Sequence, residues 1–187
     1  AVPEIKSNVK KAKVGITLNL NTAIPASDSE YDKKACAFYD AQFNKLYLDP
    51  LYNEKYPELL FNSLIEKSLI KKSDLNFIKE GDLKIISTPT DFLGVNYYSR
   101  AVIRNDDIDE KVNDKQIVSI GEKTDFGWEV YPRGIYDLLK KLQDEYNVNE
   151  IIITENGCSY ADGPDENKKV NDTERVEYHR AHIEQIL

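Results

Sequence analysis

The stretch Glu150-Ile151-Ile152-Ile153-Thr154-Glu155-Asn156-Gly157 decides the fold that we expect for this chain of 187 residues. Three consecutive isoleucines indicate a short strand that is buried on both faces, as strands of parallel sheets are. A carboxylate, an amide and a turn-forming glycine follow it. A charge at the end of a buried strand is costly unless it has partners and a use. Because catalytic groups lie at the carboxyl ends of the strands in α/β barrels, Glu155 is the first candidate catalytic residue.

Strand and helix patterns alternate along the rest of the chain, and this α/β rhythm predicts a parallel sheet. The predicted strands cover residues 14–20, 91–98 and 150–154, and Gly94 inside the second marks a close approach of the backbone. The predicted helices cover residues 32–48, 57–68, 73–77, 135–146 and 174–187. Asp49-Pro50 should end the first of these helices, and Asp172 should cap the last. We expect a loop around Pro25, weak strands or loop over 105–121, and a polar loop over 158–171.

Composition restricts the classes of partner. The formal net charge of −8 argues against nucleic acid and anionic membrane surfaces as partners. No apolar run approaches the roughly 18–20 residues that cross a bilayer. The first residues lack the apolar stretch of a signal peptide, so we expect a cytoplasmic protein. We expect Cys36 and Cys158 to be two free thiols, and a disulfide between them is the alternative. The sequence has no methionine, and its last helical pattern stops without a cap, so we expect a piece of a longer protein.

Six blocks of the sequence resemble glycoside hydrolase family 1, the retaining β-glucosidases and their relatives, in the family's order and spacing. These blocks are Ile16-Thr17-Leu18-Asn19-Leu20 with Pro25-Ala26, Leu48-Asp49-Pro50 with Tyr56-Pro57, Asp91 to Ser99, Gly127 to Gly134, Ile153 to Gly157, and the helix from Asp172 to His182. The resemblance implies a (β/α)8 TIM barrel, of which residues 1–187 would cover roughly strands 5–7 with their helices. A complete barrel needs about 250 residues. Strands 1–4 and 8 would lie outside the chain.

The resemblance also implies roles for four residues. Glu155 would be the nucleophile, and Tyr98 would donate a hydrogen bond to it. Asn96 would lie near the sugar, because the strand's period of two points it to the same face as Tyr98. Trp128 would offer an indole face to the leaving group. Without the resemblance, Tyr98 and Trp128 are more typical of core packing, and for Glu155 a surface carboxylate in a strand-to-helix loop is as good an interpretation as a catalytic residue.

The substrate expected from the resemblance is a terminal β-D-glucoside, such as cellobiose or an aryl glucoside. The family's phosphoglycosidases tend to carry serine where this chain has Asn96, so a 6-phospho-β-glycosidase is the alternative. The family's second catalytic glutamate lies in an Asn-Glu-Pro motif that this sequence lacks. We therefore expect the chain alone to be inactive. A structural or complementation fragment and a carbohydrate-binding module are the competing functions.

Metal and cofactor sites are not expected. His179 and His182 are three residues apart on the last predicted helix, but no third ligand accompanies them, so surface or capping histidines are the better interpretation. The acidic run 106–110 lacks the pattern of a calcium loop and favours a solvated loop. Open edges and an apolar inner face of a three-stranded sheet should favour association with the rest of the barrel or with another copy.

Overall fold

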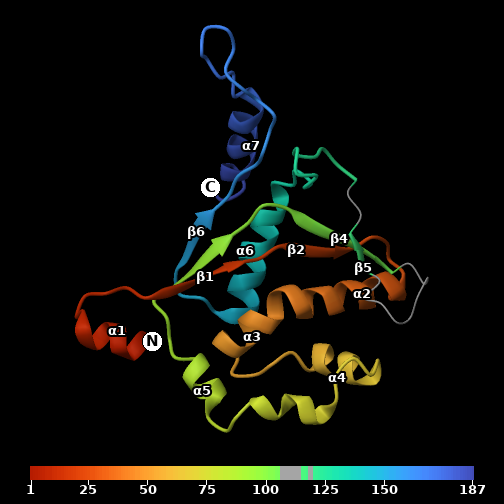
Figure 1. Cartoon of the computed structure of the whole chain (residues 1–187), viewed down its shortest axis with the longest axis vertical. Coiled ribbons are helices and arrows are strands. Elements are labelled where there is room, and N and C mark those ends of the chain that lie inside the picture. The colour runs from red at the N-terminus through yellow and green to blue at the C-terminus, as the bar shows by residue number, and fades with distance from the viewer. Residues whose placement is uncertain (106–114, 118–119) are drawn as a thin grey trace.

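A parallel sheet forms the centre of the molecule. The computed structural model of the protein describes residues 1–105, 115–117 and 120–187. The sheet contains β1 (Gly15–Asn19), β3 (Phe92–Asn96) and β6 (Ile151–Glu155), with β3 in the middle (Figure 1). All three strands agree with the sequence prediction to within two residues. A Cβ added at Gly94 would overlap the Thr17 side chain, so the close neighbour of this glycine is a side chain and not, as predicted, a backbone.

A second small sheet extends from the first. It contains β2 (Thr22–Pro25), β4 (Arg100–Asn105) and β5 (Lys115–Ile117), with β2 parallel and β5 antiparallel to the central β4. The prediction of a loop around Pro25 is wrong. Proline is tolerated there because it is the last residue of a strand at the edge of this sheet. The acidic run 106–110 lies outside the described residues.

Helices connect the strands, and the helix over Arg133–Tyr146 packs against one face of the sheet. They are α1 (Val2–Asn8), α2 (Glu30–Asp40), a π-helical turn (Ala41–Lys45), α3 (Leu46–Tyr52), α4 (Glu58–Glu66), a 3-10 helix (Lys72–Phe77), α5 (Asp82–Ile86), α6 (Arg133–Tyr146) and α7 (Thr173–Ile183). The helices predicted over 57–68, 73–77 and 135–146 are confirmed. None of the helices within the described residues is long and apolar enough to cross a bilayer.

One predicted helix end is wrong, and one predicted cap lacks its hydrogen bond. The first long helix widens into the π-helical turn and then continues through Pro50 to Tyr52, instead of ending at Asp49-Pro50. Proline removes only one backbone donor, and the helix lasts just two residues beyond it. Asp172 does stand at the start of α7, but its side chain makes no capping bond and pairs with Arg175 instead.

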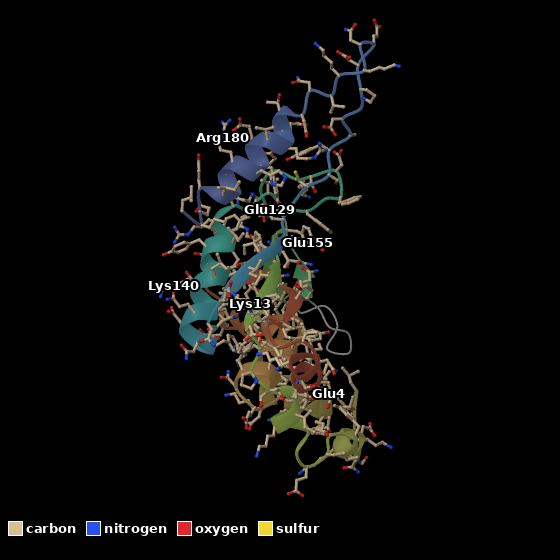
Figure 2. All side chains as sticks on the ribbon, turned by 90° about the vertical axis from the view of Figure 1, so that its left-hand side faces the viewer. Glu4, Lys13, Glu129, Lys140, Glu155 and Arg180 are labelled. Carbon is tan, nitrogen blue, oxygen red and sulfur yellow. The ribbon has the colours of Figure 1, made fainter. Side chains whose placement is uncertain are left out.

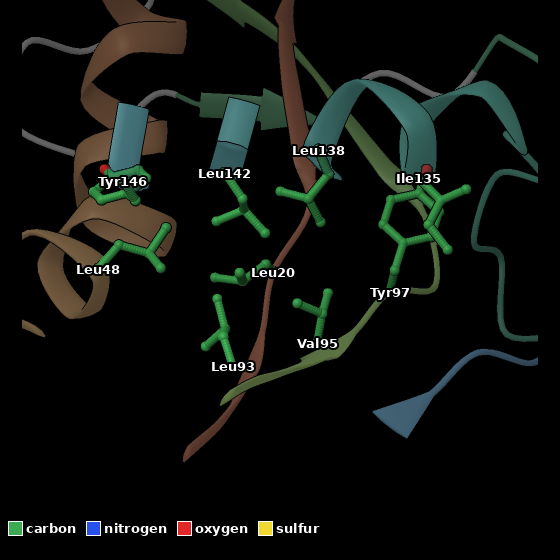
Figure 3. Packing of buried hydrophobic residues seen from close by; sticks show 9 residues of the cluster. All are labelled: Leu20, Leu48, Leu93, Val95, Tyr97, Ile135, Leu138, Leu142 and Tyr146. Atoms are coloured by element: carbon green, nitrogen blue, oxygen red, sulfur yellow. The ribbon is translucent and has the colours of Figure 1, made fainter. Parts of the chain in front are cut away.

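The main core lies between the sheet and α6. Figure 3 shows side chains of α6 meeting those of β3 across this layer. The cluster contains Leu20, Leu48, Leu93, Val95, Tyr97, Ile135, Leu138, Leu142 and Tyr146. Tyr136 lies outside the inner face of α6, because its side chain is 41% exposed and lies against the Arg133 guanidinium. The inner face instead follows the helical spacing of Ile135, Leu138, Leu142 and Tyr146.

The opposite face of the sheet is open. Ile152 is 39% exposed, and Thr17, Asn19 and Thr154 are also exposed. The predicted burial of the last strand on both faces is therefore wrong: β6 pairs only with β3 among the described strands, and only one of its faces meets the α6 layer. The expectation of an apolar inner face is also wrong, since threonine and asparagine side chains occupy most of it.

The two cysteines are free thiols, as the sequence favoured. Cys36 is buried in a smaller cluster with Tyr39, Ala101 and Ile103, where α2 packs against β4. Burial raises the pKa of the Cys36 thiol to about 11. Cys158 is partly exposed, and burial also raises its pKa. Neither thiol has the low pKa that makes a cysteine reactive.

Candidate active site

Polar side chains meet at the carboxyl end of the central sheet. Asn19 of β1 pairs in register with Asn96 of β3, and Asn96 pairs with Glu155 of β6. The register shifts between Val95 and Asn96, so that the pairing passes from Ile153 directly to Glu155 on β6. Such an irregularity redirects a side chain without ending the strand. The three strands therefore present two amides and one carboxylate in a row across the sheet.

Glu155 and Tyr98 are in direct contact. The Tyr98 hydroxyl donates a hydrogen bond to Oε2 of Glu155. This bond raises the pKa of Tyr98 to about 12, with burial as a second cause, so the phenol keeps its proton and remains a donor at neutral pH. The backbone joins the same segments, because the Tyr97 N–H donates to the Glu155 carbonyl oxygen at 2.9 Å. The Glu155 side chain itself is exposed on the open side of the sheet.

Asn96 lies next to Glu155 but bonds elsewhere. Its Oδ1 accepts a hydrogen bond of 2.6 Å from the Thr154 hydroxyl. This bond orients the amide along the edge that carries Glu155. Asn19 occupies the matching position on β1, and we did not select it from the sequence. The sequence did carry a signal for it, because Asn19 lies near the carboxyl end of the strand predicted over 14–20, as Asn96 does in the strand predicted over 91–98.

Trp128 stands beside Tyr98. The two ring centroids are 5.2 Å apart and their planes are tilted by 47°, while Phe126 packs edge-on against the indole at 5.6 Å. The Trp128 side chain remains 43% exposed. A cavity of about 250 Å³ opens next to it. Its lining comes from β1, α2, the strand ends and the loop of Trp128, and consists of Asn19, Leu20, Asn21, Tyr39, Phe43, Tyr98, Ser99, Arg100, Ala101, Gly127, Trp128 and Glu129.

Tyr178 of α7 and Asn156 hold the backbone that follows β3 by hydrogen bonds. The Tyr178 hydroxyl donates to the Tyr98 carbonyl oxygen at 3.1 Å, and the Asn156 amide donates to the Tyr97 carbonyl oxygen at 2.8 Å. Asn156 also reaches the Tyr178 hydroxyl at 3.3 Å. Sequence reasoning missed both residues, although Asn156 follows Glu155 directly. These bonds fix the backbone on both sides of the Tyr98–Glu155 pair.

The interpretation of His182 as a surface or capping residue is wrong. Its side chain is 1% exposed and stacks on the Tyr178 ring at 3.9 Å, with Nδ1 2.7 Å from the Tyr178 carbonyl oxygen. Burial lowers the pKa of His182, so the imidazole is neutral near pH 7. His179 is half-buried on the same helix. Within the described part of the chain, no three His, Cys, Asp or Glu side chains group closely enough to hold a metal ion.

The arrangement suits attack by a carboxylate on an electrophilic carbon. Glu155 is accessible, a protonated phenol holds one of its oxygens, and the Trp128 indole contacts the ring of that phenol. Figure 2 shows Glu155 and Glu129, the residue after Trp128, at the same level of the molecule, whereas Lys13 lies toward the opposite end of the sheet.

Comparisons with known proteins identify the family. The family model described as "Glycosyl hydrolase family 1" matches residues 1–187. A 1,4-beta-D-glucan glucohydrolase of Thermotoga neapolitana is 38% identical over an alignment of 192 positions, which covers 100% of this chain and 42% of the relative. A 6-phospho-beta-galactosidase of Clostridium acetobutylicum is 31% identical over 205 residues, covering 97% of this chain and 43% of the relative.

Solved structures give the same result. A beta-glucosidase from Exiguobacterium marinum superimposes with a TM-score of 0.88 at 33% identity, over 99% of this chain and 41% of that one. The family 1 enzyme from Thermotoga maritima has a TM-score of 0.83 at 36% identity, over 99% and 40% of the two chains. It has also been solved with glucoimidazole and with deoxynojirimycin. These neighbours are TIM barrels, and our chain spans about two fifths of their length. The chain belongs to glycosyl hydrolase family 1.

Proposed function

We propose that this chain is the nucleophile-bearing part of a retaining β-glucosidase, with Glu155 as the nucleophile. The observation that carries the proposal is the hydrogen bond from the Tyr98 hydroxyl to the Glu155 carboxylate, at the carboxyl end of a parallel sheet. Catalytic residues of α/β barrels come from this end of the strands. The names of the relatives support glycoside hydrolysis as the reaction.

The reaction is a double displacement. In the first step a Glu155 oxygen bonds to the anomeric carbon, the bond from that carbon to the leaving oxygen breaks, and a second carboxyl group protonates the leaving oxygen. In the second step a water molecule, deprotonated by that second group, releases the sugar from Glu155. Tyr98 orients the attacking carboxylate and holds its unused oxygen. Retention requires the two carboxyl groups to be about 5–5.5 Å apart.

The second carboxyl group comes from outside this chain in our proposal. Residues 1–187 form a partial (β/α)8 domain that supplies barrel strands 5–7, and the rest of the barrel supplies the acid and the remaining sugar contacts. Open strand edges at β1 and β6, together with a length near 40% of the relatives, support this view. Losing general acid–base help typically costs about 10²–10⁴ in rate, so the chain alone is inactive. It then behaves as a complementation fragment that associates with the missing part or with itself.

The substrate class we favour is an unphosphorylated β-glucoside such as cellobiose or an aryl glucoside. Asn96 supports this choice, because the family's phosphoglycosidases tend to carry serine at its position, and its Oδ1 accepts a hydrogen bond from Thr154 beside Glu155. A 6-phospho-β-glycoside is the second candidate, favoured by the matching 6-phospho-beta-galactosidase. A binding module without catalysis gives no reason for a protonated phenol on Glu155.

Rescue by azide tests the nucleophile in the complete enzyme that carries this sequence. In Glu155→Ala, azide occupies the vacated space, bonds to the anomeric carbon of an activated aryl β-glucoside, and expels the phenolate to give an α-glucosyl azide. Glu150→Ala is the matched control, because Glu150 lies just before the same strand at its other end and pairs with Lys13 on the surface. Hydrolysis that persists in Glu155→Ala, or a β-configured azide product, would refute the nucleophile assignment.

A further inference from the structure

A buried ion pair lies beside the candidate site and has no part in the proposed reaction. Arg100 donates from Nε and Nη2 to the two carboxylate oxygens of Glu129, each at 2.8 Å. The side chains are only 10% and 4% exposed. The guanidinium also stacks over the Tyr131 ring, 3.8 Å from its centroid. Burying such a pair is costly and often adds nothing to stability, so its geometry is the more informative property.

The pair joins the two segments that carry the aromatic residues of the site. Arg100 lies two residues after Tyr98, and Glu129 directly follows Trp128. A second link runs parallel to the first, because the Ser99 hydroxyl donates to the Glu129 carbonyl oxygen at 2.9 Å. Three bonds therefore connect the start of β4 to the residue next to Trp128. Bidentate Arg–carboxylate pairs restrict orientation as well as distance.

The loop that carries Trp128 is folded around Glu129. Lys123 and Glu129 form an antiparallel bridge, and the Thr124 N–H donates to the Trp128 carbonyl oxygen at 2.8 Å. The Val130 N–H donates to the Glu122 carbonyl oxygen, also at 2.8 Å. A Cβ added at Gly121 would lie 2.7 Å from Oε1 of Glu129, so the loop leaves space for this carboxylate. The loop is attached to β4 through Glu129, next to the indole, and to Ser159 through the N–H groups of Asp125 and Phe126.

We propose that Arg100 and Glu129 are positioning residues that hold the Trp128 indole against Tyr98 at the cavity of about 250 Å³. Neither residue touches the reacting atoms. Their effect is on the surface that meets the leaving group, so they determine how well bulky aromatic leaving groups are accepted. The effect on aromatic leaving groups rests on the proposed function, whereas the positioning of Trp128 does not.

Fluorescence of the 187-residue chain tests the positioning directly, because Trp128 is its single tryptophan. Glu129→Gln and Arg100→Met should release the loop. Since Trp128 is 43% exposed, its release should raise the acrylamide quenching constant roughly twofold and lower its anisotropy, as expected for local opening. Arg133→Gln is the matched control, because it removes an exposed pair with Asp137 and should leave the indole unchanged.

The double variant Arg100→Met/Glu129→Leu separates positioning from stability. Replacing both charges by apolar side chains often preserves folding. We expect native far-UV circular dichroism together with increased quenching of Trp128. Unchanged quenching in a folded single or double variant would overturn the proposal.

Two labelling reagents test the functional consequence in the complete enzyme that carries this sequence. With 2-deoxy-2-fluoro-β-glucosyl fluoride the leaving group is a fluoride ion, whereas the dinitrophenyl glycoside has a large aromatic leaving group. Glu129→Gln should slow labelling by the dinitrophenyl reagent about tenfold, the scale of one lost aromatic contact, and leave the fluoride reagent unaffected. Equal effects on both reagents would overturn the inference. Absence of labelling by either reagent in the unmodified enzyme would instead refute the proposed function.

Discussion

Leu138→Ala tests which face of α6 supports the sheet. Leu138 is 1% exposed and belongs to the cluster that joins α6 to β3. Shortening a buried leucine to alanine costs about 2–5 kcal/mol, and we take about 3 kcal/mol because the site lies in the middle of the cluster. Tyr136→Ala, two residues earlier on the same helix, should cost less than about 1 kcal/mol, because the ring is 41% exposed and contacts Arg133.

Urea unfolding followed by circular dichroism measures both changes. With an m-value of about 2 kcal/mol/M, Leu138→Ala should lower the midpoint by about 1.5 M, and Tyr136→Ala by less than about 0.5 M. The m-values should remain equal to that of the unmodified chain. A loss for Tyr136→Ala as large as that for Leu138→Ala would refute the packing described for α6. A loss below about 1 kcal/mol for Leu138→Ala would do the same.

Three further predictions follow from individual side chains. In Glu155→Gln, the pKa of Tyr98 should fall from about 12 toward its ordinary value of 10, because the hydrogen bond to the carboxylate is the largest cause of the raised pKa. NMR of ¹³C-labelled tyrosine rings measures this pKa, and a value still near 12 would argue against the contact. Burial lowers the pKa of His182, so its contribution to the unfolding free energy should be complete above pH 6.5 and decline as the pH falls below that value. His182→Phe should remove this part of the pH dependence of the unfolding free energy. An identical pH profile in the variant would contradict this assignment. Cys158 should react with a thiol reagent before Cys36, whose side chain is 8% exposed and whose pKa is about 11. Peptide mapping of the labelled protein measures the order of reaction, and the reverse order would contradict the burial of Cys36.

The sequence predicted the three central strands well, because each combines β-branched residues with a clear boundary. It predicted their environment poorly. The isoleucines of β6 suggest burial on both faces, but burial depends on what covers the sheet, and Ile152 faces the open side. Pro25 signals a loop locally, whereas pairing with β4 makes it the end of an edge strand. Tertiary contacts decide both cases.

Only part of the candidate site could be predicted from the sequence. Glu155 stands out because a charge follows an apolar strand, and Tyr98 and Trp128 were selected through the family resemblance. Arg100 and Glu129 carried no signal, since charged residues outside a periodic pattern are typical of solvent-exposed loops. Their pairing brings together residues 29 positions apart, and only the fold shows it.

Mapping the labelled residue tests the central claim most directly. The complete enzyme that carries this sequence is treated with dinitrophenyl 2-deoxy-2-fluoro-β-glucoside, digested and analysed by mass spectrometry. We predict one 2-fluoroglucosyl group, attached to the Glu155 carboxylate. Inactivation with the sugar on another residue, or turnover of the reagent without any adduct at Glu155, would contradict the account.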